Sequence, residues 1–311
     1  MSAPVVFSAL LPVFLLIVAG VLARRLLITE DAHWIGVERL IYYLLFPALL
    51  IDTLAHADLS RVPVEQVGGT LFAAVLIMAL ICLALRRPLA SVLGVDGPAF
   101  TSVFQGATRW QTFIALAIAG SLYGDYGLAL ASVAAIAMIP LLNVINVWVL
   151  ARYAAPKRPH WRDVLIAIAK NPLIWSCAVG IALNLLHVPI PASLHVFADA
   201  LGRAALPLGL LLVGAGLHLR GLVRPEPATL VATALKLVVM PAIAITLARA
   251  IGMTGAPLAV IACCAAVPSA SGAYVLAKQM GGDTRLLAAI LTVETILAGA
   301  TMPVAIELAL R

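Results

Sequence analysis

A run of polar residues interrupts one of the most apolar stretches of the sequence. Six of the nine residues in the segment 104–112 are polar or glycine, whereas the flanking residues are mainly Ala, Leu and Ile. Arg109 stands near the middle of this segment. A bare cation at the centre of a bilayer costs several kcal/mol, so the guanidinium of Arg109 has to face water or an anionic partner.

Two interpretations of this segment are equally good. In the first, Arg109 attracts a carboxylate, to which Gln105, Thr108 and Gln111 supply hydrogen bonds. The segment is then a binding site for a small organic anion. In the second, Arg109 forms an ion pair between two helices, with Glu294 as its partner.

A second irregularity surrounds Pro268, in another apolar segment. Proline cannot donate a backbone hydrogen bond, and Ser269, Ser271 and Gly272 follow it closely. This pattern predicts an unwound helix whose freed backbone groups line a cavity, since lipid offers them no partners. The half-helix that restarts here presents free N–H groups and the positive end of its dipole, which suits an anion. The alternative is an ordinary proline kink stabilised by the serine hydroxyls.

Other intramembrane polar residues are weaker signals. Glu294 is the best candidate for a proton carrier, and it could equally be the counter-ion of the arginine or of Lys236. The ammonium of Lys236 could instead reach the membrane surface along its own aliphatic chain. Tyr43, in the second apolar segment, is also predicted to bind the substrate. Asn143 and Asn146 are three residues apart, a spacing typical of hydrogen bonds between membrane helices.

No pattern for metal, nucleotide or nucleophilic chemistry is present. The histidines fall at the ends of apolar segments or between them, and no pair has metal-ligand spacing on one helix face. They are His33, His56, His160, His187, His195 and His218. Asp52 and Asp199 are expected to be solvated. The four cysteines, Cys82, Cys177, Cys263 and Cys264, are interpreted as small packing residues. We therefore expect neither an enzyme nor a bound cofactor or metal.

The composition places the chain in a membrane. Of the 311 residues, 63% are hydrophobic and only 11% are charged, whereas a soluble domain carries about a quarter charged residues. Ten apolar segments are each about the length of a membrane span. They are 5–23, 36–55, 67–85, 99–121, 127–151, 171–187, 197–218, 228–249, 256–279 and 286–309. The net charge of +6 does not indicate nucleic-acid binding, because the basic residues lie in short connections between these segments.

Basic residues predict the orientation of the spans. With the N-terminus outside the cell, twelve Lys and Arg residues fall on the cytoplasmic side. Only Arg61, Arg203, Arg249 and Arg311 then fall on the other side. Both termini are therefore expected to be extracytoplasmic, in a multi-pass protein of the inner (cytoplasmic) membrane. The first apolar segment is interpreted as a span rather than a cleaved signal peptide. The segment 160–170 is expected to form an interfacial helix.

An internal repeat is indicated by an offset of 160 residues. This offset aligns Pro12 with Pro172, Gly20 with Gly180, and Pro47 with Pro207. It also places five spans in each half, and an odd number of spans forces two repeats into opposite orientations. Many secondary transporters share this plan and bind substrate near the bilayer midplane. The predicted units are repeat 1–155, linker 156–170 and repeat 171–311.

Short motifs are distributed in a fixed order along nearly the whole chain. They are Tyr42–Leu50, Lys170–Ile174 followed by Gly180, Ala204–Leu210 followed by Gly214–Leu217, Val267–Ala270, Tyr274–Ala277, Gly281–Asp283 and Thr301–Pro303. Each motif is short and apolar. In this order and spacing, they resemble the auxin efflux carrier family of membrane transport proteins.

The resemblance implies an all-α protein of ten membrane helices, built as an inverted five-plus-five repeat. It also implies that broken helices cross in spans 4 and 9, and that a carboxylate anion moves by elevator-like alternating access. By the same analogy, spans 1, 2, 6 and 7 form the scaffold and the surface of a homodimer. One position departs from the family. Gln111 stands where members often carry asparagine, and the proline common in that break is missing. This departure leaves three alternatives open: the binding site is reshaped, the substrate differs, or the fourth span is less broken than the ninth.

These observations predict a secondary carrier for a small organic anion, such as a mono- or dicarboxylate. The predicted substrate-binding residues are Tyr43, Gln105, Thr108, Arg109, Gln111, Pro268, Ser269 and Ser271. Two alternatives are a sodium-coupled carrier of the bile-acid symporter type and a membrane sensor that binds a ligand without moving it. Against the sensor, the longest connection is too short for an appended signalling domain.

Overall fold

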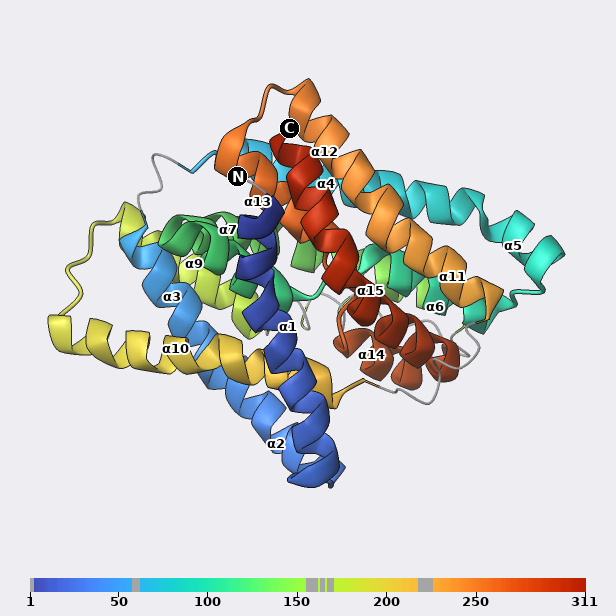
Figure 1. The fold of residues 1–311 in the computed structure, drawn as a ribbon, viewed down its shortest axis with the longest axis horizontal. Coiled ribbons are helices and arrows are strands. Elements are labelled where there is room, and N and C mark those ends of the chain that lie inside the picture. The colour runs from blue at the N-terminus through green and yellow to red at the C-terminus, as the bar shows by residue number, and fades with distance from the viewer. Residues whose placement is uncertain (1–2, 58–61, 155–161, 163–165, 167–170, 218–225) are drawn as a thin grey trace.

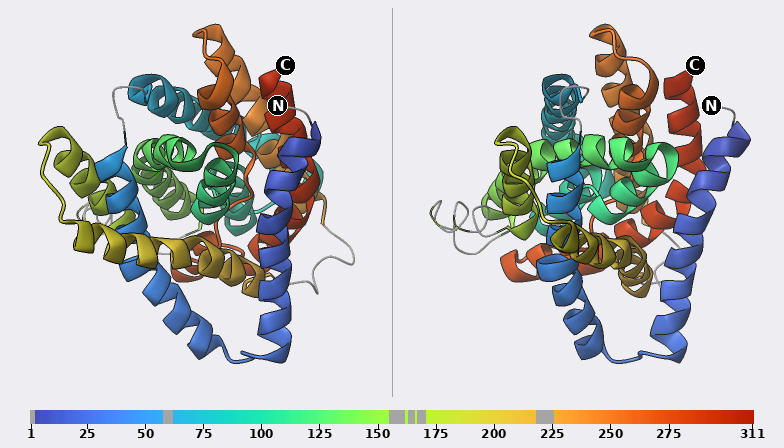
Figure 2. Two further views of the ribbon diagram at one scale, coloured as in Figure 1. Left: turned by 60° about the vertical axis from the view of Figure 1, so that its left-hand side comes forward. Right: turned by 90° about the vertical axis from the view of Figure 1, so that its left-hand side faces the viewer.

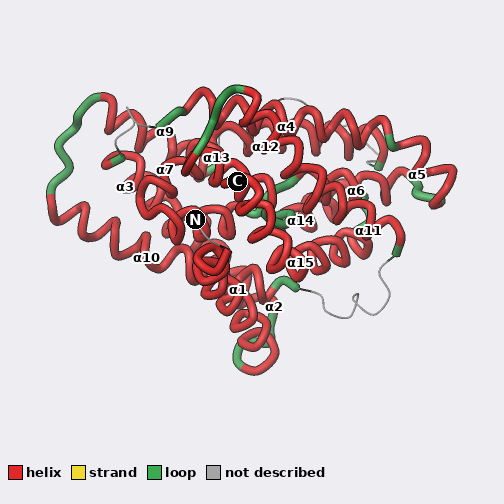
Figure 3. Tube along the Cα trace, turned by 45° about the horizontal axis from the view of Figure 1, so that its top comes forward, coloured by secondary structure: helices red, strands yellow, loops and turns green. Residues whose placement is uncertain are grey.

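The computed structural model describes residues 3–57, 62–154, 162, 166, 171–217 and 226–311 (Figure 1). Within these ranges every regular element is a helix, as the colouring of Figure 3 shows, so the predicted all-α class is confirmed. The interfacial helix expected over 160–170 falls almost entirely outside the described residues.

In the described ranges, each half of the chain contributes eight helical elements. The first half contains α1 (Ala3–Leu26), α2 (Asp31–Leu40), the π-helical turn η1 (Ile41–Leu45), α3 (Phe46–His56), α4 (Val64–Ala84), α5 (Arg86–Leu93), α6 (Gly97–Thr108) and α7 (Thr112–Tyr153). The second half contains α9 (Pro172–Leu185), α10 (Ala192–Ala215), α11 (Pro227–Ala234), the π-helical turn η4 (Leu235–Val239), α12 (Met240–Ala250), α13 (Gly255–Ala266), α14 (Gly272–Met280) and α15 (Thr284–Leu310).

Seven helical stretches in the described ranges are long and apolar enough to cross a membrane. Two shorter apolar helices, α9 and α13, accompany them. One of the seven stretches, Gly97–Tyr153, includes both α6 and α7. Within α7, Gly124 adopts φ 56° and ψ −141°, a conformation that suits glycine, and it divides this helix near the predicted boundary between the fourth and fifth spans. The count of ten spans and their inverted repeat remain predictions.

A proline follows shortly after each of the two π-helical turns in the described ranges. The turn η1 ends two residues before Pro47, and η4 ends two residues before Pro241. Because proline has no N–H group, a carbonyl in the preceding turn loses its usual partner. The wider turn shifts the hydrogen bonding to residues five apart, as the bond from Phe46 N to Ile41 O shows. Each turn rotates the face that the following helix presents.

The helices near the N-terminus form an open frame. Figure 2 shows α1 and the α2–α3 stretch meeting at one end, while α10 crosses between them. Two glycines allow α1 and α10 to approach closely. A Cβ at Gly20 would lie 2.1 Å from the Leu211 carbonyl oxygen, and one at Gly214 would lie 1.9 Å from the Ile17 carbonyl oxygen. The remaining helices pack beside this frame, and both chain ends lie on one side of the molecule (Figures 1 and 2).

Candidate functional site

The fourth predicted span is broken at its polar run. The helix α6 ends at Thr108, and α7 begins at Thr112. Arg109 and Gln111 have extended backbones, with φ −66°, ψ 157° and φ −93°, ψ 97°. The fourth span is therefore broken although it contains no proline at this point. The alternative of a less broken fourth span is thus excluded.

The ninth predicted span is broken at Pro268, as its sequence predicts. The helix α13 ends at Ala266, and α14 begins at Gly272. Val267, which precedes the proline, is extended with φ −62° and ψ 148°. Proline disfavours the helical conformation in the residue before it, which explains why α13 stops at this point.

Ser269 joins the two breaks. Its hydroxyl donates a short hydrogen bond to the carbonyl of Gly106, and it lies 3.4 Å from the Arg109 carbonyl oxygen. Its backbone N–H donates to Glu294 Oε2 at 2.9 Å. Ser269 and Glu294 are both almost fully buried. One residue of the α13–α14 break therefore connects α6 to α15, and it gives partners to backbone groups that the breaks have freed.

A cavity of about 170 Å³ lies where the two breaks meet. Residues from both breaks line it, together with residues from α2, η1, the middle of α7 and the start of α9. The lining residues with polar side chains are Glu38, Tyr42, Arg109, Trp110, Gln111, Thr112, Asn143, Asn171 and Ser271. We call this space the break cavity.

The break cavity is suited to an anion. The helices α7 and α14 begin at its wall, at Thr112 and Gly272, and no side chain caps either N-terminus. The N–H groups at the start of α7 and the positive ends of both helix dipoles thus converge on one space. In α14, the N–H groups of Ala273 and Tyr274 donate to the Ala270 and Ser271 carbonyls. Arg109 adds a full positive charge, and its Nε is buried without a hydrogen-bond partner. Glu38 also reaches the wall from α2, and it is the acidic residue among those that line the cavity.

Several predicted ligands lie behind the break cavity rather than in it. Arg109, Gln111 and Ser271 line the wall. Gln105, Thr108, Pro268 and Ser269 are buried outside the lining set. The Thr108 hydroxyl donates to the Phe104 carbonyl at 2.7 Å and lies 3.3 Å from Asn146 Oδ1, so it supports the packing of α6 on α7.

Tyr43 requires a correction, because its side chain does not line the break cavity and the residue is 63% exposed. Its neighbour Tyr42 lines the wall instead. The predicted set also omitted the lining residues Glu38, Trp110, Thr112, Asn143 and Asn171. Trp110 and Thr112 carried a local signal, since they sit inside the polar run.

The ion pair between Arg109 and Glu294, considered as an alternative, does not form. Glu294 is not among the residues that line the break cavity. It accepts a hydrogen bond from the Ser269 N–H and interacts electrostatically with Lys236. Lys236 is fully buried in η4, so the expectation that its ammonium reaches the membrane surface is wrong. Lys236 Nζ, Glu294 Oε1 and both amide atoms of Gln105 lack hydrogen-bond partners. Lys236 and Glu294 are thus a buried, interacting pair behind the crossing.

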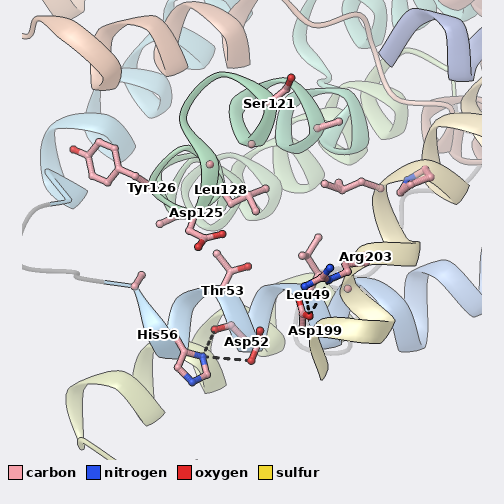
Figure 4. A pocket seen from close by; sticks show the side chains of 18 of the residues that line it. Leu49, Asp52, Thr53, His56, Ser121, Asp125, Tyr126, Leu128, Asp199 and Arg203 are labelled. Carbon is pink, nitrogen blue, oxygen red and sulfur yellow. Dashed lines mark hydrogen bonds and ion pairs between the residues drawn. The ribbon is translucent and has the colours of Figure 1, made fainter. Parts of the chain in front are cut away.

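A second, larger cavity of about 1120 Å³ opens between α1, α3, α7 and α10. We call it the vestibule, and Figure 4 shows part of its wall. Asp52 and His56 lie at the end of α3, and His195 lies on α10. Asp52, which the sequence predicts to be solvated, lines this cavity with its side chain 15% exposed, and it accepts a hydrogen bond from His195. Asp52 and His56 lie on α3 and His195 joins them from α10, so histidine spacing along one helix does not reveal the group.

Comparison with known proteins adds one finding. A family model described as "Membrane transport protein" matches residues 156–306, from the linker into α15. No curated protein matches the chain.

Proposed function

Residues 156–306 match the auxin efflux carrier family of membrane transport proteins, and from this premise we propose that the protein is a secondary carrier for a small organic carboxylate. The resemblance expected from the sequence is confirmed over this half of the chain. The family consists of transporters rather than enzymes, and the apolar helices agree with a multi-pass membrane protein.

The observation that carries the proposal is the convergence of two uncapped helix N-termini and Arg109 on the break cavity. Uncapped N-termini bind anions through backbone N–H groups, which carry no cost of side-chain ordering. Arg109 can hold a carboxylate through two parallel hydrogen bonds. With about 170 Å³, the cavity is smaller than the roughly 300–1,000 Å³ of drug-sized sites, which favours a small mono- or dicarboxylate.

We assign roles to the lining residues accordingly. Arg109 attracts the carboxylate, and the amide of Gln111 and the hydroxyls of Ser271 and Tyr42 hydrogen-bond it. Ser269 does not touch the substrate in this proposal. It is a positioning residue, because it holds the α13–α14 break against α6.

The proposed architecture has ten spans in two inverted halves. Both chain ends lie on one side of the molecule, as an even number of crossings requires (Figure 2). The two breaks fall in the fourth span of each half, and Ser269 links them. In inverted-repeat carriers, such paired discontinuous helices surround the substrate.

An elevator movement would separate a scaffold from a moving domain. We propose α1, the α2–α3 stretch, α9 and α10 as the scaffold. In support, α1 packs on α10, and α3 packs on both α9 and α10. A homodimer through this scaffold remains a prediction. Membrane potential alone could drive export of an anion, since moving one charge is worth about 2.3 kcal/mol per 100 mV.

Uptake of labelled mono- and dicarboxylates into proteoliposomes tests the proposal. Arg109→Gln should abolish uptake while leaving thermal unfolding of the purified protein nearly unchanged. Arg39→Gln is the matched control, because Arg39 is exposed on α2 and does not line the break cavity. Unchanged uptake by Arg109→Gln would overturn the assignment of this site. Dependence of uptake on sodium would favour the sodium-coupled alternative.

A further inference from the structure

Three metal-ligating side chains meet at the rim of the vestibule. Asp52 Oδ1 lies 2.7 Å from His195 Nδ1 and 3.3 Å from His56 Nδ1. All three residues offer a ligand atom within 4.8 Å of the others. The two imidazole rings have centroids 4.3 Å apart. Asp52 and His195 are far apart in the sequence, and the packing of α3 against α10 brings them together.

We propose that Asp52, His56 and His195 bind a late first-row divalent metal ion, for which Zn²⁺ is the suitable probe. Two imidazoles and one carboxylate are a common zinc ligand set that leaves coordination positions open. Ligands about 2.0–2.2 Å from a tetrahedral ion lie about 3.4 Å from one another. One ligand atom from each residue already lies within 4.8 Å of the other two, so small side-chain rotations bring the three ligands to that spacing. Mg²⁺ and Ca²⁺ prefer oxygen ligands and fit it poorly.

The surroundings orient these ligands and leave them accessible. His56 Nδ1 lies 2.9 Å from the Asp52 carbonyl oxygen, a contact that fixes the ring and leaves Nε2 for coordination. The side chains of His56 and His195 are 45% and 46% exposed, so an ion can reach them from solvent. Asp125 points into the vestibule from the opposite wall, on α7 (Figure 4). Asp199 is less available, because Arg203 pairs with it at 2.8 Å.

A structural role predicts something different. The hydrogen bond between His195 and Asp52 already joins α10 to α3 without a metal ion. If holding these helices together is the only role of the three residues, they bind no ion. Removing His195 would then weaken the apoprotein but change no response to zinc. The two roles are therefore separable by measuring metal binding directly.

The test uses the full-length chain in detergent, with any polyhistidine tag removed. Co²⁺ replaces Zn²⁺ as a spectroscopic probe, because histidine-bound tetrahedral Co²⁺ has intense visible d–d bands. We expect one Co²⁺ per chain, displaced by Zn²⁺ and unaffected by excess Mg²⁺. Zn²⁺ should also raise the melting temperature, as a ligand of the folded state does.

Substitutions of the three proposed ligands test whether they bind the metal ion. His56→Ala and His195→Ala should each weaken Co²⁺ binding by at least tenfold, and Asp52→Asn should act in the same way. His33→Ala is the control, because His33 is exposed on α2, outside the group. Absence of the d–d bands in the unmodified protein, or their persistence in His195→Ala, overturns the proposal. Binding and transport are measured separately, so failure here would leave the proposed carrier function untouched.

Discussion

The hydroxyl of Ser269 donates a hydrogen bond to the carbonyl of Gly106, and this contact links the two interrupted helices at their breaks. The carbonyl lies near the end of α6, where backbone acceptors lose their helical partners. In a membrane interior no water replaces them. The serine therefore stabilises both breaks at once, and its loss should affect the geometry of the break cavity.

Ser269→Ala should destabilise the protein by about 1–3 kcal/mol, because it leaves the Gly106 carbonyl buried without a partner. Thermal unfolding in detergent measures this change. Ser271→Ala is the matched control, since Ser271 lines the break cavity and caps no helix with its side chain. It should weaken substrate binding with little change in melting temperature. The reverse pattern would show that the two serines have been assigned the wrong roles.

Gly106→Ala should also destabilise the protein, by about 1–3 kcal/mol. A Cβ at Gly106 would lie 2.7 Å from Ile290 Cγ2 and 3.4 Å from Ala232 Cβ, so α6 would have to move away from α15 and α11. Gly69→Ala is the control within α4, where a Cβ meets nothing within 4 Å. That substitution should leave the melting temperature unchanged or raise it, because alanine is the better helix former. Equal melting temperatures for both variants would contradict the close packing.

Glu294→Gln should cost about 3–5 kcal/mol, because it leaves the buried ammonium of Lys236 without a nearby opposite charge. The glutamine can still accept the hydrogen bond from Ser269 N, so the charge is what the substitution removes. Adding Lys236→Met to Glu294→Gln should recover much of the stability. A double-mutant cycle on melting temperature measures this coupling. Additive effects of the two substitutions would show that Lys236 and Glu294 act independently.

Tyr42→Phe should weaken substrate binding several-fold, since it removes a hydroxyl from the wall of the break cavity. Tyr43→Phe should have no effect, because that side chain lies outside the cavity. Substrate-induced thermal shifts of the two variants, measured over a concentration series, compare them directly. If only Tyr43→Phe weakened binding, the substrate would not occupy the break cavity.

Cysteine accessibility should distinguish the two cavities. The four native cysteines are buried, so an introduced thiol should dominate labelling by a membrane-impermeant maleimide. The positive-inside orientation predicts that Ser271→Cys, in the break cavity, is labelled from the cytoplasmic side. Ser121→Cys, in the vestibule, should be labelled from the opposite side. Intact cells and inside-out vesicles give the two exposures. Labelling of both positions from one side would contradict the proposed orientation.

Much of the fold could be predicted from the residue types within short stretches of the sequence. Backbone groups in lipid must bond within their own helix, so spans appear in the sequence as long apolar segments. The predicted segments coincide with the helices to within a few residues at most ends, for example 67–85 against Val64–Ala84. Pro268 predicted its break because proline constrains its own residue and the one before it. The polar run around Arg109 indicated a site, although no residue there forces the helix to end.

Relations between distant elements could not be predicted in this way. Tyr42 and Tyr43 are adjacent, and which of them faces the break cavity depends on how η1 sets the rotation of its helix. Tertiary contacts also decided that Glu294 faces Lys236 rather than Arg109.

The sequence alone therefore determined which segments are helical and where polar groups interrupt them, because those properties depend on residues close in the chain. The tertiary structure decided which polar groups meet. Asp52 meets His195 only because α3 and α10 cross, and Ser269 reaches Gly106 only because the two breaks lie side by side. Such contacts depend on the rotation and crossing of whole helices, and no short stretch of sequence encodes them.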